Sequence, residues 1–308
     1  APFIPWIKKG SDKKIIWPVV EDNEGYLWAV GNKGISQINL ETGIVKNYIH
    51  DINDTNSIIA NDALTLFDRG EDKLWIAIAD HGIDELDSKT GQFRHLGRMS
   101  SGALRYINTF FQDRNDQVWL ATWQGLLQLE SETENFRYIP QKSDDDKNYG
   151  SDNVLCLYED HSGYLWLGMS NGRLKRYDAK TGLFPAYNSH HGVPWVQFSN
   201  YGINSIQESQ DGVLWLGTLN NGLRRFEVES GSFTSFTERE GLAGDAIQGI
   251  SMDDRGMLWI STDEGLSRLD PETLMFRNYG VGDGLPAGRI SKLFKSNHSG
   301  IFYFGSSE

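Results

Sequence analysis

The stretch DGVLWLGTLNNGLRRFEVESGSF, residues 211–233, recurs in recognisable form along the whole chain. The tryptophan in this stretch, Trp215, has equivalents at regular intervals: they are Trp28, Trp75, Trp119, Trp166 and Trp259, and Tyr303 takes the seventh place. Successive markers are 47, 44, 47, 49, 44 and 44 residues apart. A period in the forties whose units are rich in strand-forming residues is typical of a β-propeller with one blade per unit.

A single unit has the pattern of four short strands. In the fifth unit, residues 203–209, 213–218, 223–228 and 233–236 are the strand-like runs, and turns containing glycine separate them. This pattern predicts four antiparallel strands per blade, the first beside the central axis and the fourth on the rim. The marker tryptophan lies in mid-strand among apolar or small neighbours, so we expect it to pack between adjacent blades. An acid or amide lies six residues before most markers, and we expect it to cap its own turn rather than to serve catalysis: Asp22, Asp113, Asp160, Asp253 and Asn297.

The fourth strands carry a pair of apolar side chains three residues apart, such as Phe233 with Phe236, or Phe184 with Tyr187 in the fourth unit. Residues 3 and 6 repeat this pair at the N-terminus, which predicts an all-β, seven-bladed propeller closed by the N-terminal strand joining the last blade. The expected single domain spans 1–308, with the closing strand and a linker in 1–14, blades one to six and their links in 15–289, and the first two strands of blade seven in 290–308. Since the last unit stops before its third strand, we expect the chain to be a fragment of a longer polypeptide. The second unit departs from the pattern before Asp72, which predicts an irregular hairpin there.

Composition narrows the classes of partner. The net charge of −13 argues against nucleic acid or an anionic membrane surface as a partner. Cys156, the only cysteine, lies in an apolar run, where we expect a buried, unreactive thiol. No run approaches the roughly 18 apolar residues of a membrane helix.

Strand order predicts that the turns between second and third strands share one face of the ring with the links between blades. Loops on that face vary without disturbing the blades, so it is the natural place for a ligand. The candidates from the turns are Asp80, His81, Trp123, Gln124, Asn171, Arg173, Asn220, Asp263 and Glu264, and those from the links are Arg105, Tyr106, His190, Trp195, Tyr201 and Arg289. Aromatic rings stack on sugars while amides, acids and arginines bind hydroxyls, so this set favours an oligosaccharide. An ordinary turn or loop role is the alternative for each residue.

Catalytic and metal-binding motifs are missing from the sequence. There is no nucleophile elbow, zinc-protease helix, phosphate loop or dinucleotide fingerprint, so we predict no catalytic residue and no cofactor. The adjacent His190 and His191 lack further ligands at suitable spacing, so we predict no metal site.

The units resemble the two-component regulator propeller repeat over essentially the whole chain. The resemblance rests on the core L-W-[LI]-[GS]-T-x(2,3)-G-L of units five and six and on the links REGLAGDAI and GDGLPAGRI. Units one, two and seven depart from it at Ala29, Ala77 and Tyr303.

That family implies an extracytoplasmic ligand-sensing domain, the periplasmic part of an inner-membrane signalling protein such as a hybrid histidine kinase or diguanylate cyclase. It also implies further propeller or signalling domains in the same chain, a homodimer of the full-length protein and, in gut Bacteroidetes, an oligosaccharide ligand. It supplies no ligand motif at the level of single residues. Two alternatives remain: a propeller lyase or glycan hydrolase using His81, His190, His191 or Glu264, and an interaction scaffold without a small ligand.

Overall fold

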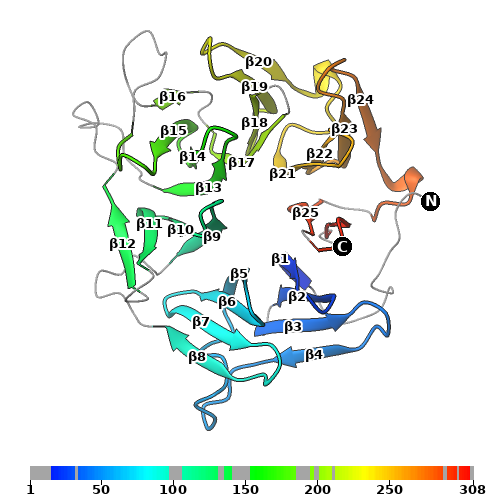
Figure 1. The fold of residues 1–308 in the computed structure, drawn as a ribbon. Helices are drawn as coiled ribbons and strands as arrows, with labels where there is room; N and C mark the ends of the chain where they lie inside the picture. The colour runs from blue at the N-terminus through cyan, green and yellow to red at the C-terminus, as the bar shows by residue number, and fades with distance from the viewer. Residues whose placement is uncertain are drawn as a thin grey trace.

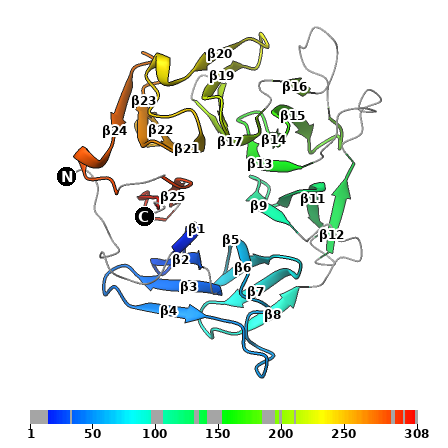
Figure 2. The same ribbon diagram turned by 180° about the vertical axis from the view of Figure 1, so that it is seen from behind.

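The computed structural model describes residues 15–31, 34–96, 106–130, 135–140, 153–184, 195–197, 201–209, 212–286, 290–296 and 298–305. These residues form six four-stranded antiparallel sheets and one two-stranded sheet. Figure 1 shows the sheets arranged as blades around a common axis, and Figure 2 shows the same ring from behind. The predicted all-β propeller with four-stranded blades is therefore confirmed.

The strands follow one another in chain order. Blades one to three are β1 (Ile15–Glu21), β2 (Tyr26–Gly31), β3 (Gly34–Asn39) and β4 (Val45–Tyr48); β5 (Ala63–Gly70), β6 (Lys73–Ile78), β7 (Gly82–Asp87) and β8 (Phe93–Leu96); β9 (Ile107–Gln112), β10 (Val118–Thr122), β11 (Gly125–Glu130) and β12 (Asn135–Ile139). Blades four to six are β13 (Val154–Glu159), β14 (Tyr164–Met169), β15 (Arg173–Asp178) and β16 (Trp195–Gln197); β17 (Ile203–Glu208), β18 (Val213–Thr218), β19 (Leu223–Glu227) and β20 (Phe233–Phe236); β21 (Ile247–Met252), β22 (Leu258–Thr262), β23 (Leu266–Leu269) and β24 (Phe276–Tyr279). The remaining sheet is β25 (Phe294–Lys295) with β26 (Phe302–Tyr303).

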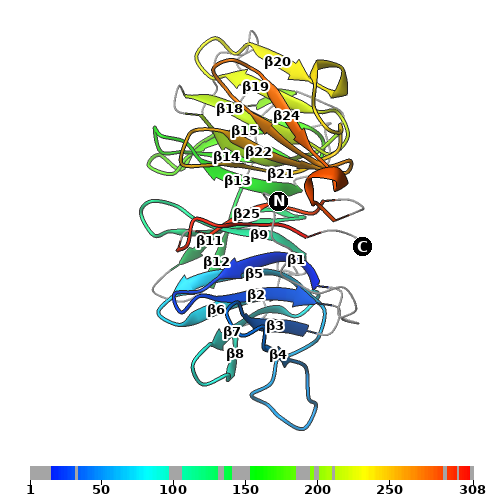
Figure 3. The same ribbon diagram turned by 90° about the vertical axis from the view of Figure 1, so that its right-hand side faces the viewer.

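Each blade places its first strand nearest the axis and its fourth at the rim, as predicted (Figures 1 and 3). Two short 3-10 helices, η2 (Glu238–Glu240) and η3 (Val281–Asp283), lie in the links that follow β20 and β24. Within the described ranges, no helix has the length and apolar character needed to cross a membrane.

The predicted number of seven blades is not what the structure shows. It has six four-stranded blades, and the two-stranded sheet β25–β26 lies in the gap between blades six and one (Figure 1). Among the described residues, the seventh unit contributes two strands. The strand expected to close the ring falls on residues 1–14, outside the described residues, and closure stays a prediction.

The fourth strand of blade four is also not where the sequence placed it. We expected it around Phe184 and Tyr187, but β16 takes that position and pairs Trp195 with Lys175 of β15. Phe184 instead packs against Tyr177, with 5.0 Å between ring centroids. Tyr187, the other member of the expected pair, lies outside the described residues.

The expected irregular hairpin in the second unit is confirmed. The pairing of β5 with β6 shifts register between Asp68 and Gly70. Glu71 and Asp72 both adopt positive φ angles, 54° and 62°. The extra residue is thus taken up by a bulge, which leaves the rest of the blade in register.

The marker tryptophans pack between neighbouring blades, as predicted. Trp166 of blade four is fully buried in one cluster with Ile203 and Leu214 of blade five. The ring centroids of Trp259 in blade six and Phe302 in the last sheet are 6.1 Å apart. The packing of a tryptophan on the next sheet therefore continues into the two-stranded sheet. Burial of each ring stabilises the fold by roughly 2–3 kcal/mol.

The acid six residues before the tryptophan does more than cap its turn. Asp160 Oδ1 accepts the backbone N–H groups of Ser162 and Tyr164, both at 2.9 Å, as expected of a cap. Its Oδ2 accepts the indole N–H of Trp166 at 2.7 Å. The same indole bond recurs in three more blades, from Trp28 to Asp22, from Trp119 to Asp113 and from Trp259 to Asp253.

Two blades lack that acid and differ from each other. In blade two, where Arg69 stands at the position, Trp75 donates to Glu85 on the neighbouring strand at 2.9 Å. In blade five the position is Ser209, and among the described residues the buried Nε1 of Trp215 has no hydrogen-bond partner. A buried donor without a partner costs stability, so blade five carries a local defect.

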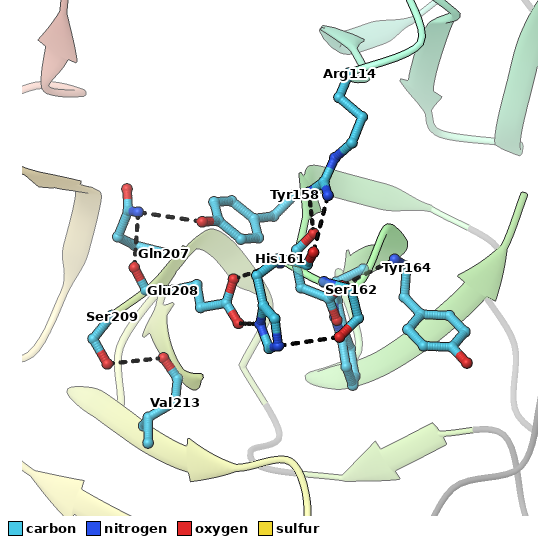
Figure 4. A network of polar contacts seen from close by, with 11 residues as sticks. Arg114, Tyr158, His161, Ser162, Tyr164, Gln207, Glu208, Ser209 and Val213 are labelled. Carbon is cyan, nitrogen blue, oxygen red and sulfur yellow. Dashed lines mark hydrogen bonds and ion pairs between the residues drawn. The ribbon is translucent and has the colours of Figure 1, made fainter. Parts of the chain in front are cut away.

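Neighbouring blades are also joined by polar contacts at the hairpins between first and second strands (Figure 4). Glu208, at the end of β17, accepts the backbone N–H of His161 at 2.8 Å and lies 2.5 Å from its Nδ1. One blade back, Glu159 accepts the backbone N–H of Arg114 at 2.8 Å and pairs with its guanidinium. An acid at the end of an inner strand thus holds the hairpin of the preceding blade.

The two-stranded sheet is attached to both of its neighbours in the same manner. Glu21 of blade one accepts hydrogen bonds from the Ser299 hydroxyl at 2.5 Å and the Tyr303 hydroxyl at 3.2 Å. Lys295 forms an ion pair with Asp254 of blade six at 2.6 Å. These contacts hold the last sheet between blades six and one.

Replacing Ser209 by Asp should repair blade five. The new carboxylate can accept the Trp215 indole N–H while still capping the turn, and we expect the free energy of unfolding to rise by about 1 kcal/mol. Chemical denaturation measures it. The matched reverse change, Asp160→Ser in blade four, should lower the free energy of unfolding by about 1–3 kcal/mol. A fall in stability for Ser209→Asp would contradict this assignment.

The contact between blades four and five should also appear as a pH dependence. Glu208 raises the pKa of His161 above its ordinary value of 6.5, so the stabilisation is complete below that value and is lost as the pH rises through the folded-state pKa. NMR titration should show Glu208→Gln lowering the His161 pKa towards 6.5. Glu159→Gln, which removes the acid facing Arg114 instead, should change it much less. Equal titration in wild type and Glu208→Gln would exclude the contact in solution.

Candidate functional site

Backbone hydrogen bonds bring the turns between second and third strands against the links between blades. The first N–H groups after β6, β10 and β18 donate to the links that precede the inner strands: Ala79 to Asp62 at 2.9 Å, Trp123 to Tyr106 at 3.2 Å and Leu219 to Gly202 at 3.0 Å. The two sets of loops therefore lie side by side, as strand order predicted. We call the surface that they form the loop face.

The strongest feature of the loop face is an aromatic pair. Trp123 in the β10–β11 turn stacks on Tyr106 in the link before β9, with 4.4 Å between ring centroids and 23° between ring planes. The side chains stay 56% and 37% exposed. The turn thus holds two rings together at the surface with a large area open to solvent.

Polar candidates in the turns are held by their own backbone. Asp80 has a positive φ of 60°, and His81 Nδ1 lies 2.7 Å from the carbonyl oxygen of Ala79. Asn171 accepts the backbone N–H of Arg173, whose side chain is buried. Local contacts of this kind fix the side chains before any ligand binds.

The remaining described candidates lie on the same set of loops. Asp263 accepts the backbone N–H of Ala246 at 3.3 Å, which ties its turn to the link before β21. Glu264, Gln124 and Asn220 are exposed. Tyr201 is 46% exposed and precedes Gly202, whose carbonyl oxygen accepts the backbone N–H of Leu219.

Four candidates need separate comment. Arg105, His190 and Arg289 lie outside the described residues. Trp195 was expected in a link on the loop face, but its backbone belongs to β16, the outer strand of blade four, because it pairs with Lys175.

Sequence reasoning missed a cavity of about 150 Å³ beside the axis of the ring. The inner strands of blades three to six line it together with the segment before β25, and its polar groups are Thr109, Asn204, Ser205, Gln248 and Lys292. A usable signal was present, since polar residues interrupt inner strands that we treated as apolar. Asn204 and Gln248 fall at register shifts of β17 and β21, where a bulge redirects a side chain.

Burial raises the pKa of the Cys156 thiol in this cavity to about 12. Lys292, which lines the same cavity, is exposed to solvent. Cys156 is buried and donates to the carbonyl oxygen of Ile203 at 3.4 Å. The thiol is therefore protonated at neutral pH and, as expected, unsuited to act as a nucleophile.

One group of side chains has the order of a hydrolase triad (Figure 4). Glu208 lies 2.5 Å from His161 Nδ1, and the Ser162 hydroxyl lies 3.1 Å from His161 Nε2. Acyl transfer also needs N–H donors aimed at the developing oxyanion. In this turn Glu208 takes the N–H of residue 161, and Asp160 takes those of residues 162, 163 and 164. We therefore assign the group to the contact between blades rather than to catalysis.

Metal-binding side chains do not gather in the described part of the chain. No group of three or more His, Cys, Asp or Glu residues there is placed to hold a metal ion.

Parts of the chain are similar to known proteins. A family model described as the two component regulator propeller matches residues 148–171 and 197–220. The comparison with curated proteins gave no match.

Solved structures share the fold. The extracellular domain of the putative hybrid two-component system BT3049 from B. thetaiotaomicron is 24% identical with a TM-score of 0.76, over 96% of this chain and 38% of that one. The corresponding domain of BT4673 from the same organism is 15% identical with a TM-score of 0.55, over 94% and 51%. Virginiamycin B lyase from Staphylococcus aureus is 14% identical with a TM-score of 0.67, over 94% and 90%.

Identities this low establish the fold and no more. This chain spans about 38% of the length of the BT3049 domain and 51% of that of BT4673. The chain is thus a propeller with four-stranded blades, and two segments of it match the two component regulator propeller model.

Proposed function

We propose that this propeller is the ligand-sensing domain of a bacterial membrane signalling protein of the two-component type, located in the periplasm. The observation that carries the proposal is the pair of matched repeats at residues 148–171 and 197–220. The shared fold with two extracellular domains of putative hybrid two-component systems supports it. Such a domain binds a ligand and signals its presence without converting it chemically.

We place the ligand, an oligosaccharide, on the loop face. The stacked pair Tyr106–Trp123 offers an exposed aromatic area for the apolar face of a sugar ring. Exposed polar groups on the same set of loops, such as Glu264 and Asn220, can bind hydroxyls. A few placed polar groups beside aromatic surface are typical of small-molecule sites.

The blades are packed too closely to change shape on binding. Each tryptophan joins two blades through a buried cluster, and acids join the hairpins as well. Binding therefore acts by favouring one arrangement of this propeller against further propeller or signalling domains of the chain, or against a second copy in a homodimer.

The fold of virginiamycin B lyase makes an enzyme the second candidate. On the described loop face, His81 is a half-buried histidine whose Nδ1 already contacts a carbonyl oxygen. Nδ1 donates to that oxygen, which leaves Nε2 as the nitrogen that can take a proton from a substrate. His81 is therefore the residue at which the enzyme alternative is tested.

A panel of oligosaccharides from plant, algal and animal polysaccharides should contain one that raises the melting temperature. At a hundred times its dissociation constant, that ligand stabilises the fold by about 2.7 kcal/mol. Trp123→Ala and Tyr106→Ala should each weaken its affinity at least about fivefold, since one stacked ring contributes roughly 1 kcal/mol or more. Phe233→Ala, which removes an exposed ring of the outer strand β20, is the matched control.

The same mixtures distinguish the alternatives when they are examined for breakdown of the sugar. Breakdown that His81→Ala abolishes would make the chain an enzyme. If no oligosaccharide in the panel raises the melting temperature, an interaction scaffold is favoured. Unchanged affinity in both aromatic variants would remove the ligand from the Tyr106–Trp123 pair.

A further inference from the structure

The outer strand of blade five differs in charge from other strands on the rim. β20 has the sequence Phe-Thr-Ser-Phe, and its first three residues are exposed. Thr234 in this strand lies opposite Arg225, which itself lies opposite the marker Trp215. In the rim strands of blades one, two, three and six, the equivalent position carries a basic side chain: Lys46, Arg94, Arg137 and Arg277.

A basic residue on an edge strand protects that strand from pairing with another chain. Blade two has a second protection, because the backbone N–H of Phe93 on its rim strand donates to the carbonyl oxygen of Asn56 in a link at 3.0 Å. β20 carries no charged side chain and is the last strand of its sheet. Within the described ranges, no further strand pairs with its outer edge (Figure 1).

The backbone of β20 is oriented for pairing at this edge. The backbone N–H of Glu227 donates to the carbonyl oxygen of Ser232 at 2.9 Å, so these two residues form a hydrogen-bonded pair. Such pairs alternate along antiparallel strands, so Thr234 also bonds to β19. The N–H and C=O groups of Phe233 and Ser235 therefore point away from the blade.

A second copy of this chain matches the edge because of where a twofold axis would fall. The register that uses residues 233 and 235 of both copies places Thr234 of one copy opposite Thr234 of the other. Threonines directly opposite each other are a favourable cross-strand pair. The same arrangement at the rim strands of blades one, two, three and six would oppose two lysines or two arginines, which is unfavourable.

We propose that β20 is a self-association surface, at which two copies of this chain pair their rim strands antiparallel about Thr234. The two blades then form one continuous sheet through backbone hydrogen bonds. Two short strands make a small interface, which belongs to the weak and transient class. The proposal rests on the rim strand alone and does not depend on the sensor proposal, to which it adds a contact for the homodimer.

Sedimentation equilibrium of the 308-residue chain tests the pairing at protein concentrations up to about 1 mM. The wild type should show a reversible equilibrium between monomer and dimer. Thr234→Lys, which introduces the kind of residue found on the other rims, should weaken dimerisation at least about fivefold, or about 1 kcal/mol, because a like-charge pair replaces a favourable one. Thr234→Val keeps a neutral β-branched side chain and should retain the dimer.

Ser235→Pro tests the backbone hydrogen bonds separately. The N–H of Ser235 points away from β19, so proline at this position removes a donor between the two copies and none within the blade. We expect this variant to lose the dimer while its melting temperature stays close to that of the wild type.

Thr55→Lys is the matched control, since it makes the same change at an exposed residue of a link. It should dimerise at least as well as the wild type, because an added lysine lessens the repulsion between two chains of net charge −13. The proposal is overturned if the wild type stays monomeric, if Thr234→Lys or Ser235→Pro dimerises like the wild type, or if Thr55→Lys loses the dimer. A large fall in the melting temperature of Ser235→Pro would also overturn it, because that N–H would then be bonded within the fold.

Discussion

The hydrogen bond from a buried tryptophan to the acid six residues earlier is the interaction on which the ring depends. A tryptophan brings a large apolar surface to the contact between two blades, but its indole N–H must find an acceptor when it is buried. Asp160 supplies that acceptor for Trp166 and uses its other oxygen to cap the hairpin. One carboxylate therefore couples the turn of a blade to its packing on the next.

The polar contacts at the hairpins follow from the same geometry. Inner strands of adjacent blades converge towards the axis, so the acid that ends one strand reaches the hairpin of the blade before it, as Glu208 reaches His161. Bulges at the start of the inner strands are the other consequence of this convergence, and at Asn204 and Gln248 they coincide with residues that line the cavity. The axis and the loop face are thus two different chemical environments on one scaffold. The first is lined by inner strands with polar side chains such as Asn204 and Gln248, and the second presents Trp123 beside Tyr106 to solvent.

The predictions that failed share a cause. Phe184 and Tyr187 have the spacing of a fourth strand, yet the strand that pairs with β15 is β16, further along the chain. Asp160 was correctly recognised as a turn cap, and its second bond, to the Trp166 indole, was missed although the same six-residue spacing recurs in four blades. What was missed in both cases is which side chains or strands meet, and the period of the repeat does not state that.

The sequence by itself determined the repeat, the strand order within a blade and the loops that share a face, because these depend on local alternation and on turn residues. It also identified the tryptophans as contacts between blades, since a large ring in mid-strand must be buried somewhere. The tertiary structure alone decided that Trp123 stacks on Tyr106 and that, among the described residues, the buried indole N–H of Trp215 has no acceptor. Those facts arise where separate segments converge on one point, and convergence is fixed only when the blades pack into a ring.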